Sequence, residues 1–390
     1  MGGSSVRTTT STELVVERLQ PDAHAELVDG WGATNLQVPE WAKVKAEWRN
    51  ESLVWRRPDG TPAGCALVLY RPIPHVGRYL AYLPEGPLLP WDEVVADPEA
   101  WLAPLIAHLR TRRAFAVRLG PTVPLQHWST ATAKAGLADE ALKQLDELPA
   151  DQEDPTGQAL VEVLRGSGWQ SLSGGHGFAA GQPDYVVQVP LAGRSEADLR
   201  AAMNQEWRRN LNKGVKLGVE VREGTRDDLP AFHTLYRETA TRDKFTPRPE
   251  AYFRRMWDAF AGGTEVPGTG RTRMRLYLAE LDGQPLAGAL VVRVGTHATY
   301  TYGASTSAHR EARASNALQW RAMRDALAEG CHVYDFRGIS STLDADSPLI
   351  GLLRFKLGAG GEVTRYVGEW ELTLSQVWHT ALRAYLRLRS

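Results

Sequence analysis

The alternation of apolar and polar residues along this chain occurs twice in the same order. Asp59-Gly60 and Asp282-Gly283 each lie between two apolar, β-rich runs. Each pair predicts a tight hairpin, because glycine accepts the positive φ of such turns. In both copies a helical pattern then leads into another strand, at residues 101–113 and 115–120 in the first copy and 316–329 and 333–338 in the second. This order predicts a duplicated α+β domain with a cleft between its halves.

The rest of the pattern completes the two copies. Strands are expected at residues 13–18, 52–56, 65–70, 79–83, 115–119, 185–189, 275–280, 287–294, 299–302, 333–336 and 364–374. Helices are expected at residues 37–48, 98–111, 195–214, 229–242, 249–260, 314–329, 351–357 and 375–388, and helices with loops over 121–160. We predict a first domain of residues 13–184, completed by the C-terminal segment 366–390, and a second domain of residues 185–365.

Composition restricts the class of protein. The 390 residues are 43% hydrophobic and 23% charged, as in ordinary globular domains. No segment approaches the roughly 18 consecutive apolar residues of a membrane span, and the polar N-terminus lacks the apolar core of a secretion signal. Only Cys65 and Cys331 occur, and the 10 histidines form no metal-ligand pattern. These features predict a cytoplasmic protein with no metal site.

The order of strands and helices resembles the acyltransferase architecture known as GNAT. Its acetyl-CoA members need a glycine-rich loop before the main helix, because backbone N–H groups there bind the pyrophosphate. The corresponding residues here, 310–316, include Arg313 where glycine is required, and that side chain would obstruct the approach of a ligand to the backbone. An acetyl-CoA enzyme is therefore not expected, and no cofactor is predicted.

Five further stretches occur in the order typical of one family. They are Gln37-x3-Trp41-Ala42-Lys43-Val44-Lys45, Arg248-Pro249-x2-Tyr252-Phe253, Tyr300-Thr301-Tyr302-Gly303-Ala304-Ser305, Tyr334-Asp335-Phe336-Arg337-Gly338-Ile339 and Phe355-Lys356. Together they resemble the FemABX aminoacyltransferases, which build the cross-bridges of peptidoglycan. The resemblance extends from about residue 35 to 371 and is closest to actinobacterial FemX-like members, as in Asn35-Leu36-Gln37-Val38-Pro39 and Leu83-Pro84-Glu85-Gly86-Pro87.

The resemblance implies two tandem GNAT-like domains that use an aminoacyl-tRNA donor and a muropeptide acceptor. The acceptor is either a UDP-MurNAc-peptide or its lipid-linked form, which would place the protein in peripheral contact with the inner membrane face. The implied reaction adds an amino acid, glycine as the first expectation, to the third residue of the stem peptide. Some members carry a long coiled-coil arm, but residues 190–276 show no sustained heptad pattern, so the armless form is expected.

Lys45 and Arg248 match the family positions that hold the acceptor diphosphate. Two cations suit a doubly charged group, and arginine can donate to phosphate through two N–H groups. Gln37, Trp41 and Lys45 are spaced four residues apart, so they are expected to share one helical face and to line the acceptor site together. The alternative is that both cations are ordinary surface residues.

Tyr252, Tyr300 and Tyr302 match residues around the peptide-binding cleft of the family. Tyr300 and Tyr302 alternate on one strand and are therefore expected to point the same way. The alternative is that these tyrosines are core aromatics whose hydroxyl groups are satisfied within the protein.

Lys356 matches the family lysine beside the reacting ester and is the predicted catalytic residue. A fixed ammonium group can stabilise the oxyanion of aminolysis or the departing ribose oxygen; the alternative is a lysine that extends from a short helix to solvent. Relatives of FemX can carry aspartate at a strand end where this chain has Gly120. The general base is therefore not identified from the sequence.

The net charge of −1 gives no global basic field, so DNA is not an expected partner and tRNA contact requires a local patch. Such a patch is expected on the helix that carries Arg208, Arg209, Lys213 and Lys216 beside Trp207. Two or three of these cations share a face and suit tRNA phosphates. A basic face that only contacts solvent is the alternative.

Two other functions are compatible with the same motifs. One is a tRNA-dependent amide ligase of antibiotic biosynthesis or resistance, which would use the same cleft with another acceptor. The other is a catalytically inactive tandem-GNAT binding protein, which the glycine at position 120 favours.

Overall fold

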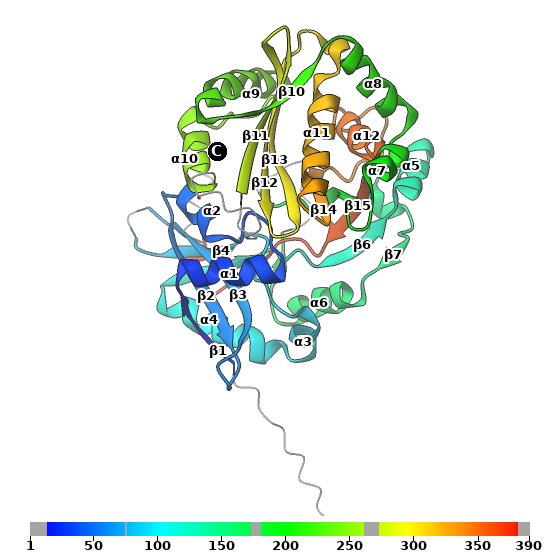
Figure 1. The fold of residues 1–390 in the computed structure, drawn as a ribbon. Coiled ribbons are helices and arrows are strands. Elements are labelled where there is room, and N and C mark those ends of the chain that lie inside the picture. The colour runs from blue at the N-terminus through cyan, green and yellow to red at the C-terminus, as the bar shows by residue number, and fades with distance from the viewer. Residues whose placement is uncertain (1–13, 75, 173–180, 261–272, 381–390) are drawn as a thin grey trace, which may run out of the picture.

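The computed structural model describes residues 14–74, 76–172, 181–260 and 273–380 (Figure 1). The first sheet has seven strands in the order β1 (Val15–Leu19), β2 (Arg49–Arg56), β3 (Pro62–Pro72), β4 (Tyr79–Leu83), β5 (Ala114–Leu119), β16 (Trp370–Thr373) and β8 (Gln170–Ser171). The second sheet has nine, in the order β10 (Glu220–Gly224), β11 (Arg273–Leu281), β12 (Gln284–Val294), β13 (His297–Ser305), β14 (Val333–Ile339), β9 (Tyr185–Pro190), β15 (Glu362–Tyr366), β6 (Pro124–Trp128) and β7 (Gln152–Glu153).

Helices surround both sheets. The α-helices of the described residues are α1 (Pro21–Trp31), α2 (Pro39–Val44), α3 (Trp91–Ala96), α4 (Pro98–Thr111), α5 (Thr130–Ala138), α6 (Pro155–Gly166), α7 (Glu196–Ala202), α8 (Gln205–Lys216), α9 (Leu229–Asp243), α10 (Glu250–Phe260), α11 (Ala314–Ala328) and α12 (Ile350–Gly358). Short 3₁₀ turns occupy Leu145–Glu147, Arg226–Asp228 and Arg310–Ala312. No helix of the described ranges is long and apolar enough to cross a membrane.

The predicted duplication is confirmed by the pairing of the strands. In the first sheet β2, β3 and β4 are antiparallel neighbours, and β4 pairs in parallel with β5 after the intervening helix α4. In the second sheet β11, β12 and β13 are antiparallel, and β13 pairs in parallel with β14 after α11. Both Asp-Gly turns connect hairpin strands, with a φ of 84° at Gly60 and 75° at Gly283.

The chain crosses between the sheets near its C-terminus. The single strand expected at residues 364–374 is wrong: β15 belongs to the second sheet and β16 to the first, and Gly368 separates them with a φ of 78°. Strands β6 and β7 lie within the predicted first domain, but they pair into the second sheet. The domain limits 13–184 with 366–390, and 185–365, therefore stay a prediction, and the sheets exchange strands across them.

Two other expected helices differ from the structure. The helix expected at 195–214 is two helices, because Asn204 interrupts it and its side chain accepts a hydrogen bond from the N–H of Trp207 at the start of α8. The helix expected at 37–48 is only α2, which ends before Lys45. Residues 381–388 of the expected last helix lie outside the described residues.

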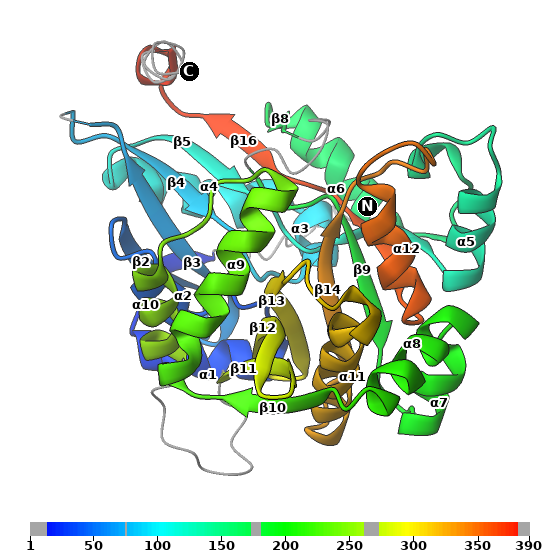
Figure 2. The same ribbon diagram turned by 90° about the horizontal axis from the view of Figure 1, so that it is seen from above.

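Strands β11–β13 have separate apolar cores on their two faces. Figure 2 shows α9 and α11 on opposite sides of these strands. Phe232 and Phe253, from α9 and α10, pack in one core with α2, whereas Leu318 and Phe336, from α11 and β14, pack in the other. Helix α2, which precedes β2 of the first sheet, therefore packs against the helices of the second half.

Candidate active site

The two cations predicted to bind phosphate lie at one aromatic cluster. The ammonium group of Lys45 is 5.3 Å from the ring centre of Trp41 and 5.8 Å from that of Tyr252. The guanidinium group of Arg248 is 5.3 Å from the ring of Tyr252. Among the residues that the structure describes, neither cation forms an ion pair with a carboxylate. The contact between α2 and α10 thus brings Lys45 and Arg248 together from different halves of the protein.

The pKa of Lys45 is lowered, first by burial and then by the positive charge of Arg248. Arg255 adds a smaller effect in the same direction, and its guanidinium group lies 5.9 Å from the same Tyr252 ring. Mutual repulsion among these cations disfavours the fully charged state. A doubly charged anion bound between them would remove that repulsion, so the cluster is chemically suited to a diphosphate.

Gln37 does not lie in the cluster formed by Lys45, Arg248 and Tyr252. It precedes α2, is completely buried, and its side-chain amide donates to the carbonyl of Pro84 while its oxygen accepts from the N–H of Leu67 at 3.2 Å. A Cβ at Gly86 would lie 2.3 Å from this Gln37 oxygen. Gln37 therefore braces the turn that follows β4, and its predicted role in binding the acceptor stays a prediction.

Tyr300 and Tyr302 point to opposite faces of the second sheet, so their expected common direction is wrong. Leu290 pairs with Tyr302 and Val291 with Tyr300, which leaves Thr301 as an extra residue in a β-bulge. One extra residue reverses the alternation of the side chains. The ring of Tyr300 therefore packs against Phe336 at 6.4 Å.

On the other face, the hydroxyl group of Tyr302 donates to that of Tyr252 at 3.0 Å. Tyr302 thus belongs to the cation cluster, and Tyr300 belongs to the core beside α11 and α12. Burial raises the pKa of Tyr300 to about 12. It also raises the pKa of Tyr302, so both hydroxyl groups are neutral at physiological pH.

Lys356, the predicted catalytic residue, is buried with 3% of its surface exposed. Its ammonium group donates to the backbone carbonyls of Arg337 at 3.0 Å and Gly338 at 2.7 Å, at the end of β14. The alternative of a lysine that extends to solvent is therefore wrong. Burial lowers its pKa to about 7, although the charge of Asp335 opposes this shift.

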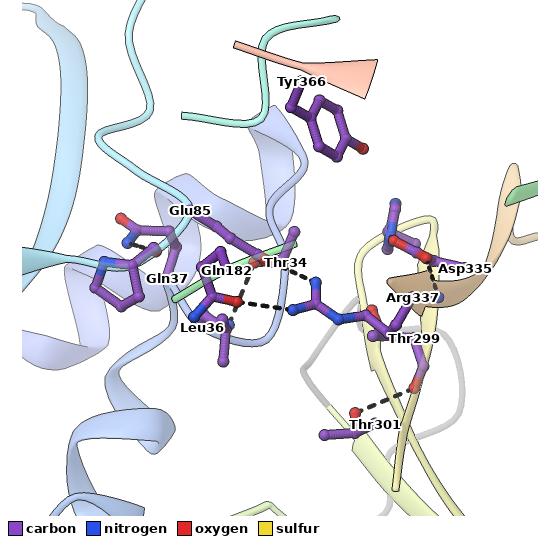
Figure 3. Close-up of polar contacts among 12 residues, drawn as sticks. Thr34, Leu36, Gln37, Glu85, Gln182, Thr299, Thr301, Asp335, Arg337 and Tyr366 are labelled. Carbon is purple, nitrogen blue, oxygen red and sulfur yellow. Dashed lines mark hydrogen bonds and ion pairs between the residues drawn. The ribbon is translucent and has the colours of Figure 1, made fainter. Parts of the chain in front are cut away.

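Arg337 reaches from the second sheet toward Glu85 and Gln182 of the first half (Figure 3). Its backbone has a φ of 64°, in the left-handed region, and its N–H donates to the carboxylate of Asp335 at 2.6 Å. Its guanidinium group reaches across to form an ion pair with Glu85 and donates to the side-chain oxygen of Gln182 at 2.9 Å. Arg337 thus contacts Lys356 through its carbonyl and the first half of the protein through its side chain.

Asp335 is buried, and neighbouring donors contact both of its carboxylate oxygens. Besides the Arg337 N–H, His297 contacts it at 3.3 Å and the amide of Gln188 donates to it at 3.3 Å. Burial alone would raise the pKa of Asp335, but the bond from His297 and the nearby Arg337 lower it overall. This carboxylate therefore stays charged. It lies at a bulge in β14, where the register with β9 shifts between Asp335 and Gly338, and the backbone of this bulge presents two carbonyls to Lys356.

A carboxylate does lie at the position where the sequence lacks one. A Cβ added to Gly120 would lie 2.9 Å from Cγ of Glu369, and Glu369 accepts a hydrogen bond from the Tyr82 hydroxyl at 2.6 Å. Burial raises the pKa of Glu369. The residues Glu85, Gln182 and Glu369 were not identified as site residues from the sequence. Of these, only Glu85 lies in a quoted motif; the other two are placed by contacts between distant segments.

The basic helix α8 packs directly against the helix that carries Lys356. The indole N–H of Trp207 donates to the carbonyl of Phe355 at 2.8 Å, and the two rings are 5.0 Å apart. Arg208 is used within the protein, because it donates to the carbonyls of Ala201 and Met203 at the end of α7. The other three predicted cations, Arg209, Lys213 and Lys216, are exposed.

In the part of the chain that the structure describes, no group of three or more His, Cys, Asp or Glu side chains is placed to hold a metal ion. Both cysteines are buried free thiols.

Comparison with known proteins gives consistent relatives over most of the chain. The FemAB family model matches residues 28–268 and 272–386. The lipid II:glycine glycyltransferase of Staphylococcus epidermidis is 23% identical over 413 residues, covering 90% of this chain and 91% of the relative. The crystal structure of FemX superposes with a TM-score of 0.75 at 19% identity, covering 94% of this chain and 99% of FemX. A tandem GNAT protein from the clavulanic acid biosynthesis pathway has a TM-score of 0.51 at 12% identity, with 93% and 99% covered.

Proposed function

This chain, an α+β protein of two tandem GNAT-like halves, belongs to the FemAB family, and we propose that it is a tRNA-dependent aminoacyltransferase of peptidoglycan assembly. It would transfer an amino acid from its tRNA ester to a primary amine on the stem peptide of a muropeptide. The observation that carries this proposal is the buried Lys356 ammonium group, held at the end of β14 by two carbonyls.

The proposed reaction is an aminolysis. The acceptor nitrogen attacks the ester carbonyl carbon, a C–N bond forms, and the C–O bond to the ribose breaks. The amine loses a proton, and the ribose oxygen gains one. Lys356 lies in a site where its charge is poorly screened, so it would stabilise the oxyanion and the departing oxygen by a few kcal/mol. Because the ester is already activated, no nucleotide hydrolysis is required.

The cation cluster supports a diphosphate-bearing acceptor. Lys45 and Arg248 would hold the diphosphate, with the aromatic side chains of Trp41, Tyr252 and Tyr302 around it. The relative from S. epidermidis is named for lipid II and for glycine. We therefore propose glycine as the amino acid and a lipid-linked muropeptide as the acceptor, with the soluble UDP-linked form as the second substrate to test.

The exposed cations of α8 would contact the tRNA. Helix α8 packs on α12 through Trp207 and Phe355, so phosphates bound along α8 would lie on the side of the protein that carries Lys356. A basic face opposite a buried apolar face suits a phosphate backbone, since it gives charge without base selection.

Transfer assays with separately charged tRNAs and both acceptor forms test the proposal. We expect a muropeptide extended by one residue, formed only with charged tRNA and abolished by ribonuclease. Product formation from acetyl-CoA, or from ATP with free glycine, would contradict it.

A further inference from the structure

One carboxylate oxygen beside the proposed catalytic lysine has no hydrogen-bond partner. Glu85, in the turn after β4, is 4% exposed, and its Oε1 is bound by the Arg337 guanidinium group. Its Oε2 is buried and has no hydrogen-bond partner among the residues that the structure describes. The carboxylate therefore has one satisfied oxygen and one that lacks a partner.

Such an oxygen is costly to keep. A buried acceptor without a partner destabilises a protein, and does so more strongly when it is charged. The neighbouring amide of Gln182 does not relieve it, because its Nε2 donates to the Tyr82 hydroxyl at 3.0 Å. Native proteins pair nearly all buried polar atoms, so an exception beside the proposed catalytic lysine is a candidate contact for a hydrogen-bond donor of the substrate.

The position of this oxygen relative to Lys356 is set by one residue. The carbonyl of Arg337 binds the Lys356 ammonium group. The Arg337 side chain binds Glu85 (Figure 3). Arg337 thus holds both the Lys356 ammonium group and the carboxylate of Glu85, whose Oε2 has no partner. A carboxylate can only accept hydrogen bonds, and an amine supplies the donors it lacks.

On the basis of the proposed function, we propose that Oε2 of Glu85 binds the primary amine of the acceptor. This contact would dock the nucleophile on the Arg337 side of Lys356 and select acceptors that end in a primary amine over those that end in a methyl or hydroxyl group. A hydrogen bond to a carboxylate also favours the positive charge that the amine nitrogen acquires as it attacks.

The test compares two soluble probes by calorimetry. One is a UDP-linked muropeptide whose third residue ends in a primary amine, and the other has a methyl group in place of that amine. Wild type is expected to bind the amine form at least about tenfold more tightly. Glu85→Gln keeps an oxygen for Arg337 but replaces Oε2 by an NH₂ group, so it is expected to bind both probes equally. Glu85→Asp is expected to recover part of the preference.

A third probe separates this contact from a general change of structure. UDP-MurNAc without the peptide uses only the Lys45 and Arg248 end of the site, so its affinity should be the same in wild type and Glu85→Gln. The inference is overturned if Glu85→Gln retains the amine preference, or if it weakens all three probes alike. If wild type binds none of the three soluble probes, the same comparison is made with the lipid-linked muropeptide and its methyl analogue; if these do not bind either, the proposed function fails and this inference fails with it. If wild type and Glu85→Gln both bind all three probes and prefer the amine form to the same extent, this inference fails but the proposed function does not.

Discussion

The ammonium group of Lys356 donates a 3.0 Å hydrogen bond to the backbone carbonyl of Arg337. The same Arg337 forms an ion pair with Glu85, so the group proposed to stabilise the reaction is attached to the contact between the two halves. A shift of one half relative to the other would change the position of this ammonium group.

Replacement of the proposed catalytic lysine should lower the rate of transfer. Lys356→Met is expected to lower kcat by roughly 100- to 1,000-fold, because one group that stabilises an oxyanion contributes about this much. The KM values for both substrates should change little, since the charge acts mainly in the transition state. Steady-state kinetics with varied donor and acceptor will measure this. A variant with near-normal turnover would leave Lys356 as a structural residue.

The pH dependence of kcat should show the titration of the same lysine. Its folded pKa of about 7 lies well below the ordinary value for lysine, so the ammonium form is lost as pH rises through about 7, and kcat should lose that contribution. Arginine stays charged over the whole range, so Lys356→Arg should be slower but lack this falling limb. A falling limb retained in Lys356→Arg would assign the titration to another group.

The cation cluster should act on acceptor binding. Lys45→Met and Arg248→Met are each expected to weaken the acceptor by about 1.5–3 kcal/mol, the usual contribution of a charged hydrogen bond. This corresponds to a rise in acceptor KM of roughly 10- to 150-fold, with the donor KM nearly unchanged. Lys43→Met is the matched control, because Lys43 is exposed on α2. If Lys43→Met and Lys45→Met raise the acceptor KM equally, the effect comes from the overall charge of the protein and not from a diphosphate site.

Neutralising the exposed cations of α8 should weaken the binding of the tRNA donor. Replacing Arg209, Lys213 and Lys216 together by glutamine should raise the Kd for tRNA and reduce its salt dependence, because fewer counterions are released. Filter binding at several salt concentrations will measure both effects. Arg208→Gln serves as the contrast: it removes bonds to the end of α7 and should lower the melting temperature instead. A triple variant with unchanged tRNA affinity would exclude this face.

The contact between α8 and α12 depends on one glycine. A Cβ at Gly358 would lie 2.5 Å from the ring of Trp207, so Gly358→Ala should destabilise the protein by about 1–3 kcal/mol through overpacking. Gly351 lies in the same helix with no atom within 4 Å of an added Cβ, and Gly351→Ala should be neutral or stabilising by about 0.5–1 kcal/mol. Urea unfolding of the two variants will compare them. Equal stabilities would show that Trp207 can move aside.

The sequence predicts those parts of the fold that depend on neighbouring residues. The Asp-Gly turns fix both hairpins, and their repeated order gives the duplicated architecture. The bulge at Thr301 was not predictable, because it depends on register with β12, and it reversed the expected direction of Tyr300 relative to Tyr302. The break in the last strand is similar, since a continuous apolar pattern does not reveal that Gly368 leads the chain into another sheet.

In the candidate site, too, the residues that lie in sequence motifs were predictable, and those placed by contacts between distant segments were not. Lys356 was found because it lies in a motif, and the meeting of Lys45 with Arg248 followed from the resemblance. The carboxylate of Glu369 was missed because it reaches the space beside Gly120 from a segment far along the chain. Glu85 was quoted within a motif, but its importance depends on the ion pair with Arg337, which only the packing of the two halves creates.

The exchange of strands between the sheets has a consequence for synthesis on the ribosome. Strand β16 lies between β5 and β8, yet it is formed by residues 370–373. Domains usually fold in order from the N-terminus as the chain emerges, but here β8 has no neighbouring strand until residues 370–373 have been translated. While the second half is being made, the first half is therefore expected to keep an open sheet edge at β5, and such an edge can pair with other chains.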